Sequence, residues 1–352
     1  MRRARFPERA LMSPLSNLAV RDVETLVHPY INLASFRESG PLVIERAQGV
    51  YVYDSNGKAY IEGMAGLWCT ALGYGNEELV EAATAQMRKL SFAHLFTGKS
   101  HDPAIELADK LKEIAPVPIS KVFFCNSGSE ANDTQVKLVW YLNNARGKPQ
   151  KKKIISRMKA YHGVTAVAAS LTGLAGNHRD FDLPLPGFLH AGCPHHYRFA
   201  QDGESEEEFA SRLADELETL IMHEGPETVA AFIAEPVMGA GGVIVPPKTY
   251  FQKIMAVCAR HDLFVISDEV ICAARQARHD VRLREARVSA AGHLRRRGAV
   301  VGVSADRRGD NPRAHVRGAA AREQEARLIR SWLYVRRPSG FRRRRPQGDR
   351  DL

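Results

Sequence analysis

The residues best suited to chemistry lie where an apolar, strand-like run meets a helical pattern, in the segment FFCNSGSEAND at 123–133. An amphipathic pattern typical of a helix runs from Glu130 to about Asn143. The turn Ser127–Ser129 therefore lies at a helix N-terminus, where backbone N–H groups lack intrahelical partners and the helix dipole is positive. Such a turn can bind a phosphate, although a Ser/Gly turn is also an ordinary N-cap. The segment predicts an anion site and leaves a simple cap as the alternative.

A second chemical signal is a pair of acidic residues that follows an apolar strand. Asp268 and Glu269 come directly after the run LFVIS at 263–267. A carboxylate delivered by an apolar strand is costly unless a cation or a hydrogen-bond donor meets it. A protonated pyridine nitrogen is such a partner. Together with a phosphate site and an aromatic face at Tyr161, this suggests pyridoxal phosphate as cofactor.

These residues need elements that bring them together, and the sequence predicts an α/β arrangement. Short apolar strands alternate with helical patterns: strands at Lys153–Ser156, Thr228–Ala234 and Leu263–Ser267, and helices at Glu77–Leu90, Asp102–Ile114, Glu206–His223 and Lys248–His261. Such alternation predicts a mostly parallel sheet flanked by helices. Ligands bind beyond the carboxyl ends of such strands, which gathers the Ser127 turn, Tyr161, Glu235 and Asp268. Nearer the N-terminus, Val43–Asp54 and 59–62 predict an antiparallel hairpin.

At this point the sequence resembles a known family. From about Met12 to Ile271 it is similar to class III aminotransferases of the pyridoxal-phosphate fold type I group, close to the omega-amino-acid and amine:pyruvate transaminases. The matching motifs are IEGMAGLWC, FFCNSGSEAND, KAYHGVT, AEPVMGAGGVIVPP and VISDEV. The resemblance implies a homodimer that moves an amino group from an amine or omega-amino acid to a keto acid such as pyruvate. It also implies three regions: a small-domain part at 1–75, a partial cofactor-binding domain at 76–271, and an Arg-rich segment outside the family at 272–352.

The resemblance gives each site residue a role. The residues concerned are Ser127, Gly128 and Ser129 for the cofactor phosphate, Tyr161 and Val270 for the two ring faces, His162 as a further cofactor-binding residue, Asp268 for the pyridine nitrogen, Glu235 as support for Asp268, and Trp68 for the substrate pocket.

The Schiff-base lysine of the family has no counterpart. The family places it about thirty residues after the aspartate, because that lysine must form the covalent link and move the proton. In this chain that position falls near Arg295–Arg297, and the last lysine is Lys253. A guanidinium stays protonated and is a poor nucleophile. We therefore expect the chain as written not to be a working transaminase, unless Lys159, Lys248 or Lys253 takes the role.

The charge distribution separates the C-terminal segment from the rest. Residues 1–271 contain 14 Lys, 14 Arg and 32 acidic residues, a net charge of −4, whereas residues 272–352 contain 22 Arg, 8 acidic residues and no Lys, a net charge of +14. One interpretation is a basic tail that binds nucleic acid or an acidic partner. The other is a frameshift near Cys272. The segment has few aromatic residues and no motif of a nucleic-acid reader, which favours the frameshift.

The remaining signals concern location and metals. Five cysteines without a paired spacing predict a reducing, cytoplasmic location, and the sequence has no apolar run of membrane-spanning length. The Arg-rich start lacks the apolar core of a secretory signal, and Met12 is an alternative start. Cys193, His195 and His196 lack a second ligand pair, so the sequence favours a loop there over a metal site.

Overall fold

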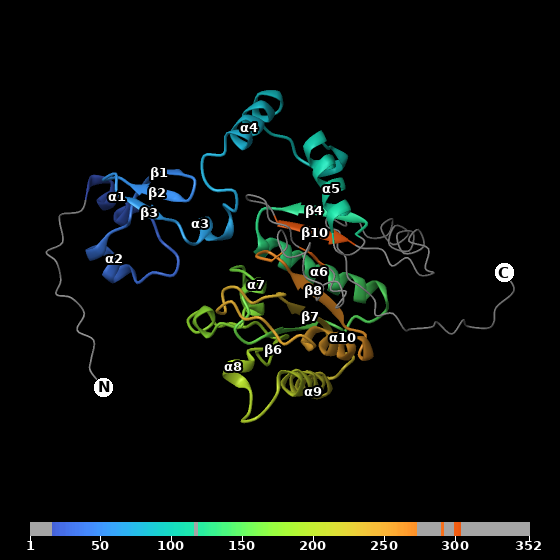
Figure 1. Ribbon diagram of the computed structural model, residues 1–352. Helices are drawn as coiled ribbons and strands as arrows, with labels where there is room; N and C mark the ends of the chain where they lie inside the picture. Colours follow the sequence, from blue (N-terminus) through green and yellow to red (C-terminus); the bar gives the residue numbers. More distant parts are fainter. Residues whose placement is uncertain (1–15, 116–118, 273–289, 292–298, 304–352) are drawn as a thin grey trace, which may run out of the picture. The chain divides into compact units, whose positions relative to one another are not determined.

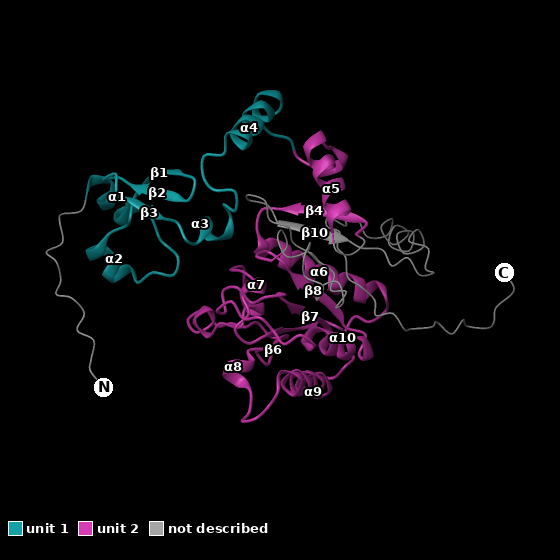
Figure 2. Ribbon diagram, in the orientation of Figure 1, with its two compact units in different colours: residues 1–93 teal, residues 94–352 magenta. Residues whose placement is uncertain are grey.

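The computed structural model describes residues 16–115 and 119–272, and the backbone of 290–291 and 299–303. The chain forms two compact units, residues 1–93 and 94–352 (Figure 2). The boundaries expected at residues 75 and 271 stay predictions. The unit at 1–93 is called the first unit and the other the second unit.

The first unit combines short helices with a small antiparallel sheet. Its elements are α1 (Asn17–Thr25), α2 (Leu33–Ser39), β1 (Ile44–Gln48), β2 (Tyr51–Asp54), β3 (Ala59–Ile61), α3 (Ala65–Trp68) and α4 (Glu77–Lys89). The predicted antiparallel hairpin is confirmed for β2 and β3. Its first strand, predicted as Val43–Asp54, is instead two strands, because the chain reverses at Gly49 and β1 pairs with β2. Gly49 has a φ of +58°, a conformation that glycine adopts without a steric cost. The alternation of side-chain types in the sequence continues across this two-residue turn, so the turn could not be predicted from it.

The second unit carries the larger sheet. Its elements are η1 (Phe96–Gly98), α5 (Asp102–Ile114), β4 (Lys121–Cys125), α6 (Gly128–Ala145), β5 (Lys153–Arg157), α7 (Ala166–Leu171), η2 (Ala175–Asn177), β6 (Phe188–Ala191), α8 (His196–Phe199), α9 (Glu206–Glu224), β7 (Val229–Ala234), α10 (Tyr250–Arg260), β8 (Phe264–Asp268), β9 (Ala290–Ala291) and β10 (Ala299–Val303).

The order of the larger sheet is β6-β5-β7-β8-β9, and all of its pairings are parallel (Figure 1). Strand β4 pairs with β10 in an antiparallel ladder. The predicted α/β class with a mostly parallel sheet is confirmed. The sequence did not predict β6, because the four residues FLHA at 188–191 are too short to show a period.

The core lies on both faces of the larger sheet. Strand β7 is buried along its whole length and supplies side chains to both faces. Phe232 packs with Leu217 of α9 and Ile254 of α10 in one cluster. Ile233 packs with Val139 of α6 in the other. This double cover explains why β7 is continuously apolar rather than alternating.

Two further properties bear on the expectations above. Among the described helices, none is both long and apolar enough to cross a membrane. None of the five cysteines, which all lie in the described part of the chain, forms a disulfide; Cys69 is exposed, and Cys193, Cys258 and Cys272 are buried.

Candidate active site

The N-terminus of α6 presents free backbone donors. Ser127 is the N-cap, and its Oγ accepts a hydrogen bond from the Glu130 N–H at 3.1 Å. The Glu130 carboxylate accepts from the backbone N–H of Asn126 at 2.7 Å. The N–H groups of Gly128 and Ser129 have no acceptor among the described residues. The turn is therefore a true helix cap that still leaves two donors for an anion.

Glycines let two other segments approach this turn closely. A Cβ added to Gly128 would lie 2.8 Å from Cγ2 of Val270. A Cβ added to Gly163 would lie 2.3 Å from Oγ of Ser129, and the φ of Gly163 is +132°. The Ser129 hydroxyl accepts from the Val164 N–H at 3.0 Å. The residues after β8 and the loop after β5 thus both border the turn.

Asp268, the last residue of β8, is 5% exposed and held by donors on both oxygens. Its Oδ2 accepts from Asn132 Nδ2 and lies within hydrogen-bond distance of His162 Nδ1, both at 2.8 Å. Its Oδ1 accepts from the Val270 N–H at 3.2 Å. These hydrogen bonds give both oxygens of the buried carboxyl group partners within the protein. The structure brings Asp268 together with His162 and Val270, and their roles toward a cofactor stay predictions.

Glu235 follows β7 directly and holds the loop that carries Tyr161. Its side chain is buried, Oε1 accepts from the Tyr161 N–H at 3.1 Å, and Oε2 accepts from the Gly239 N–H at 3.2 Å. Burial raises the pKa of the Glu235 carboxyl, while the nearby His162 and Arg157 lower it. The contacts of Glu235 therefore fix the Tyr161 loop, whereas its predicted support of Asp268 has no direct hydrogen bond.

Glu269 is a second buried acid at this end of the sheet. Its carboxyl accepts from the Ser267 hydroxyl at 3.0 Å. Burial raises its pKa to about 7, the Ser267 hydrogen bond opposes that shift, and Asp268 adds to it. The carboxyl ends of β7 and β8 therefore carry three buried acids, Glu235, Asp268 and Glu269.

The structure adds three residues that the sequence analysis missed. Asn132 bridges Asp268 and the His162 carbonyl, and the Thr172 hydroxyl accepts from the His162 N–H at 2.9 Å. Arg157 donates to the Glu235 carbonyl. Asn132 could have been suspected as a polar residue on the buried face of α6, and Arg157 as a cation ending an apolar strand. Thr172 gave no sequence signal.

Several predicted positions are not part of this cluster. Trp68 lies in the first unit, so its substrate role stays a prediction. Among the described residues, no lysine forms a hydrogen bond or ion pair with Asp268, and Lys253 pairs with Glu207 at 2.6 Å. Arg295–Arg297 and most of the Arg-rich segment lie outside the described residues.

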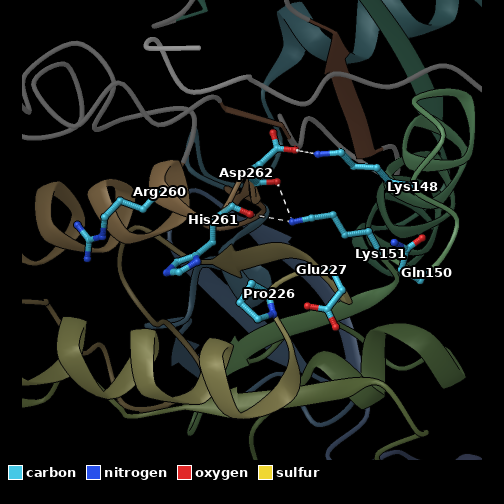
Figure 3. Close-up of a pocket in the computed structure, with 8 residues that line it drawn as sticks. All are labelled: Lys148, Gln150, Lys151, Pro226, Glu227, Arg260, His261 and Asp262. Atoms are coloured by element: carbon cyan, nitrogen blue, oxygen red, sulfur yellow. Dashed lines mark hydrogen bonds and ion pairs between the residues drawn. The ribbon is translucent and has the colours of Figure 1, made fainter.

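A cavity of about 310 Å³ lies at the opposite, amino end of the sheet (Figure 3). Its lining includes Lys148, Lys151 and Asp262. The Lys151 ammonium donates to the carbonyls of His261 and Asp262 at 2.8 and 3.1 Å, and Lys148 pairs with the Asp262 carboxylate at 2.7 Å. Because these cations already have partners within the protein, the cavity is best explained as part of a structural network.

Comparison with known proteins identifies the family to which the chain belongs. The family model "Aminotransferase class-III" matches residues 34–276. A chloroplastic gamma aminobutyrate transaminase from Solanum lycopersicum is 58% identical over 233 residues, and a mitochondrial one from Oryza sativa subsp. japonica is 59% identical over 234. Each match covers 66% of this chain and 45% of the relative, so the chain spans about half the length of these relatives.

Solved structures show the same relationship. A thermostable omega transaminase mutant from Pseudomonas jessenii is 55% identical with a TM-score of 0.82, and the match covers 89% of this chain and 70% of that one. The omega transaminase of the same organism in complex with PMP is also 55% identical, with a TM-score of 0.81 and coverage of 88% and 68%. The predicted fold and family are thereby confirmed, and the chain belongs to the class III aminotransferases, a family that uses pyridoxal phosphate.

Proposed function

We propose that this chain is the cofactor-binding part of an aminotransferase that moves an amino group from an amine or omega-amino acid to a keto acid such as pyruvate. The observation that carries the proposal is the buried Asp268 carboxylate, held by donors on both oxygens beside a helix N-terminus with free N–H groups. The substrate class follows from relatives named as gamma-aminobutyrate and omega transaminases.

The residues present fit pyridoxal phosphate. Gly128 and Ser129 have free N–H groups for a phosphate, and the close approach of Val270 needs a glycine at position 128. Asp268 offers a carboxylate to a protonated ring nitrogen, with Tyr161 and Val270 as the residues flanking the ring. When bound, the cofactor supplies an electron sink for the bonds that are broken at the substrate carbon. The protein's own part is to orient that ring and to keep its nitrogen protonated.

We also propose that the chain binds the cofactor without turnover. No lysine follows Lys253, and lysine is the residue that forms the covalent link and moves the proton in this chemistry. The family match ends at residue 276, close to the predicted frameshift at Cys272. Resequencing the codons for 268–297 tests the frameshift interpretation: a one-base insertion or deletion that restores a lysine near 297 would mean that the sequence as written is damaged. If the reading frame stands as written, the chain lacks this lysine and the aminotransferase assignment describes its ancestry only.

The binding proposal is tested by equilibrium dialysis of pyridoxal phosphate against the full chain. Gly128→Ala is the comparison variant that should lose affinity. Its added methyl would clash with Val270, whereas alanine itself is well tolerated in the first turn of a helix. We expect binding by the wild type, weaker binding by the variant, and no alanine formed from γ-aminobutyrate and pyruvate. Failure of the wild type to bind would contradict the proposed function. If the wild type instead forms alanine, Lys159, Lys248 and Lys253 would be replaced one at a time to find the lysine that takes the catalytic role.

We further propose a homodimer. The first unit exposes many large apolar side chains, among them Val27 at 82% and Phe92 at 80%, and exposed apolar surface of this kind is typical of interfaces. Sedimentation of the full chain tests it, and a monomer at all concentrations contradicts it. The cytoplasmic location rests on cysteine usage alone, and several relatives are named as chloroplastic or mitochondrial.

A further inference from the structure

Arg157 is one of the largest side chains that are fully buried in the described part of the protein. It ends β5, and its Nη2 donates to the backbone carbonyl of Glu235 at 2.7 Å. Its Nε and Nη1 have no hydrogen-bond partner among the described residues. Burying a guanidinium with unpaired N–H groups is costly, so its charge needs other compensation.

That compensation comes from two aromatic rings and one carboxylate. The Arg157 Cζ lies 6.0 Å from the ring centroid of Tyr250 and 5.8 Å from that of Phe251, within the range of cation–π attraction. The Glu235 carboxylate supplies negative charge nearby. Burial raises the pKa of that carboxyl, and first His162 and then Arg157 act against this effect. The cation and the carboxylate therefore each reduce the cost of burying the other.

Glu235 needs its negative charge for the contacts it makes. It accepts one backbone N–H on each oxygen, from Tyr161 and Gly239. A carboxylate accepts on both oxygens, whereas a protonated acid or a glutamine presents a donor at one of the two positions. Loss of the charge would thus release one of the two N–H groups.

We propose that Arg157 is a positioning residue: its buried charge keeps Glu235 a carboxylate, and Glu235 fixes the backbone of Tyr161. Only the final consequence, placement of the Tyr161 ring against the cofactor, rests on the proposed function. The chain of contacts runs across neighbouring parallel strands, from the end of β5 to the end of β7 and back to the loop after β5.

The first test is amide hydrogen exchange of the ligand-free full chain. In Arg157→Met we expect the Tyr161 and Gly239 amides to exchange at least about tenfold faster than the change in global stability alone would predict. The control is Leu217→Ala, a buried α9 variant compared at matched global stability by adding denaturant. Equal exchange of the two amides in both variants would show a merely structural role and overturn the proposal.

Rescue separates charge from volume. Arg157→Lys keeps the charge, and we expect it to protect the Tyr161 and Gly239 amides better than Arg157→Met does. If the methionine variant does not fold, Arg157→Gln replaces it as the neutral form. Protection by the neutral form equal to that by lysine would exclude a role for the charge.

The pH profile of cofactor binding gives a second readout. Among the described residues, the charged and titratable groups near Glu235 are Arg157, His162, Asp268, Cys193 and Cys272. In Arg157→Met we expect pyridoxal phosphate affinity to fall further between pH 8 and 6.5 than in the wild type, because Glu235 takes up a proton. The double variant with Glu235→Gln should lose this extra pH dependence.

Identical profiles in the wild type and Arg157→Met would count against the proposal. If the wild type does not bind the cofactor, the proposed function fails, and the exchange comparison still decides the role of Arg157.

Discussion

The two ends of the parallel sheet differ in how their charged side chains are neutralised. At the amino end, Asp262 pairs with Arg146. It also pairs with Lys148, and Lys151 donates to two carbonyls (Figure 3). At the carboxyl end, the acids Asp268 and Glu269 are buried and held mainly by neutral donors. A network that is satisfied within the protein stabilises the fold, whereas an excess of buried acid prepares a place for a cation. The contrast supports the proposal that the carboxyl end is the binding end.

The largest expected difference between the ends concerns cofactor affinity. Asp268→Ala removes the partner of the ring nitrogen and should weaken pyridoxal phosphate binding by about 2–5 kcal/mol, the usual cost of removing one member of a buried charged pair. Asp262→Ala removes a carboxylate at the other end, so it should lower the free energy of unfolding and leave affinity unchanged. Dialysis and chemical denaturation of both variants test this. Equal affinity losses would remove the distinction between the ends.

The buried acid Glu269 should make the carboxyl end sensitive to neutral pH. Its folded pKa of about 7 lies above its unfolded value, so the stability it contributes is complete at low pH and is lost as the pH rises through 7. Relative to the wild type, Glu269→Gln should gain on the order of 3 kcal/mol of unfolding free energy between pH 4 and 8. Denaturant titrations at both pH values measure this gain. If the difference in unfolding free energy between the wild type and Glu269→Gln is the same at both pH values, Glu269 does not have a raised pKa in the folded protein.

The buried Lys151 should give the amino end the opposite dependence. Burial lowers its pKa to about 8, below its unfolded value, so the unfolded chain binds more protons between pH 8 and 10. The wild type should therefore gain roughly 2–3 kcal/mol of unfolding free energy over Lys151→Met as the pH rises through that range. Lys148→Met, which changes a more exposed lysine at the same cavity, should show no such gain. A gain of the same size in that control would assign the effect to another group.

The smallest effect comes from two matched helix caps. Ser127 caps α6 at the binding end, and Ser205 caps α9 through a bond to the Glu208 N–H. Changing either serine to alanine should cost about 1 kcal/mol of unfolding free energy. Only Ser127→Ala should also weaken pyridoxal phosphate binding. If both variants bind the cofactor equally well, the Ser127 hydroxyl serves only as a cap.

The residues of the proposed site were easier to predict from the sequence than the contacts that hold them. Asp268 and the Ser127 turn were predictable, because each follows an apolar strand and precedes a change of period. The partners of Glu235 were not, because Gly239 and Tyr161 meet it only once the ends of β5 and β7 lie side by side. Asn132 was hidden for the same reason, since its role depends on which face of α6 meets the sheet. Local pattern gives the strand ends, and tertiary pairing decides which polar groups share a hydrogen bond.

The distribution of the free cysteines has a practical consequence for labelling. Burial raises the pKa of the thiols of Cys125 and Cys272 to about 11 and that of Cys258 to about 12, and it also raises the pKa of Cys193. Since thiolates react and neutral thiols do not, these four positions should resist maleimides at neutral pH. Cys69 is exposed and lies in the first unit. The native chain can therefore carry one fluorophore on Cys69, and energy transfer to or from a cofactor bound at Asp268 would measure the distance between the two units without any mutation.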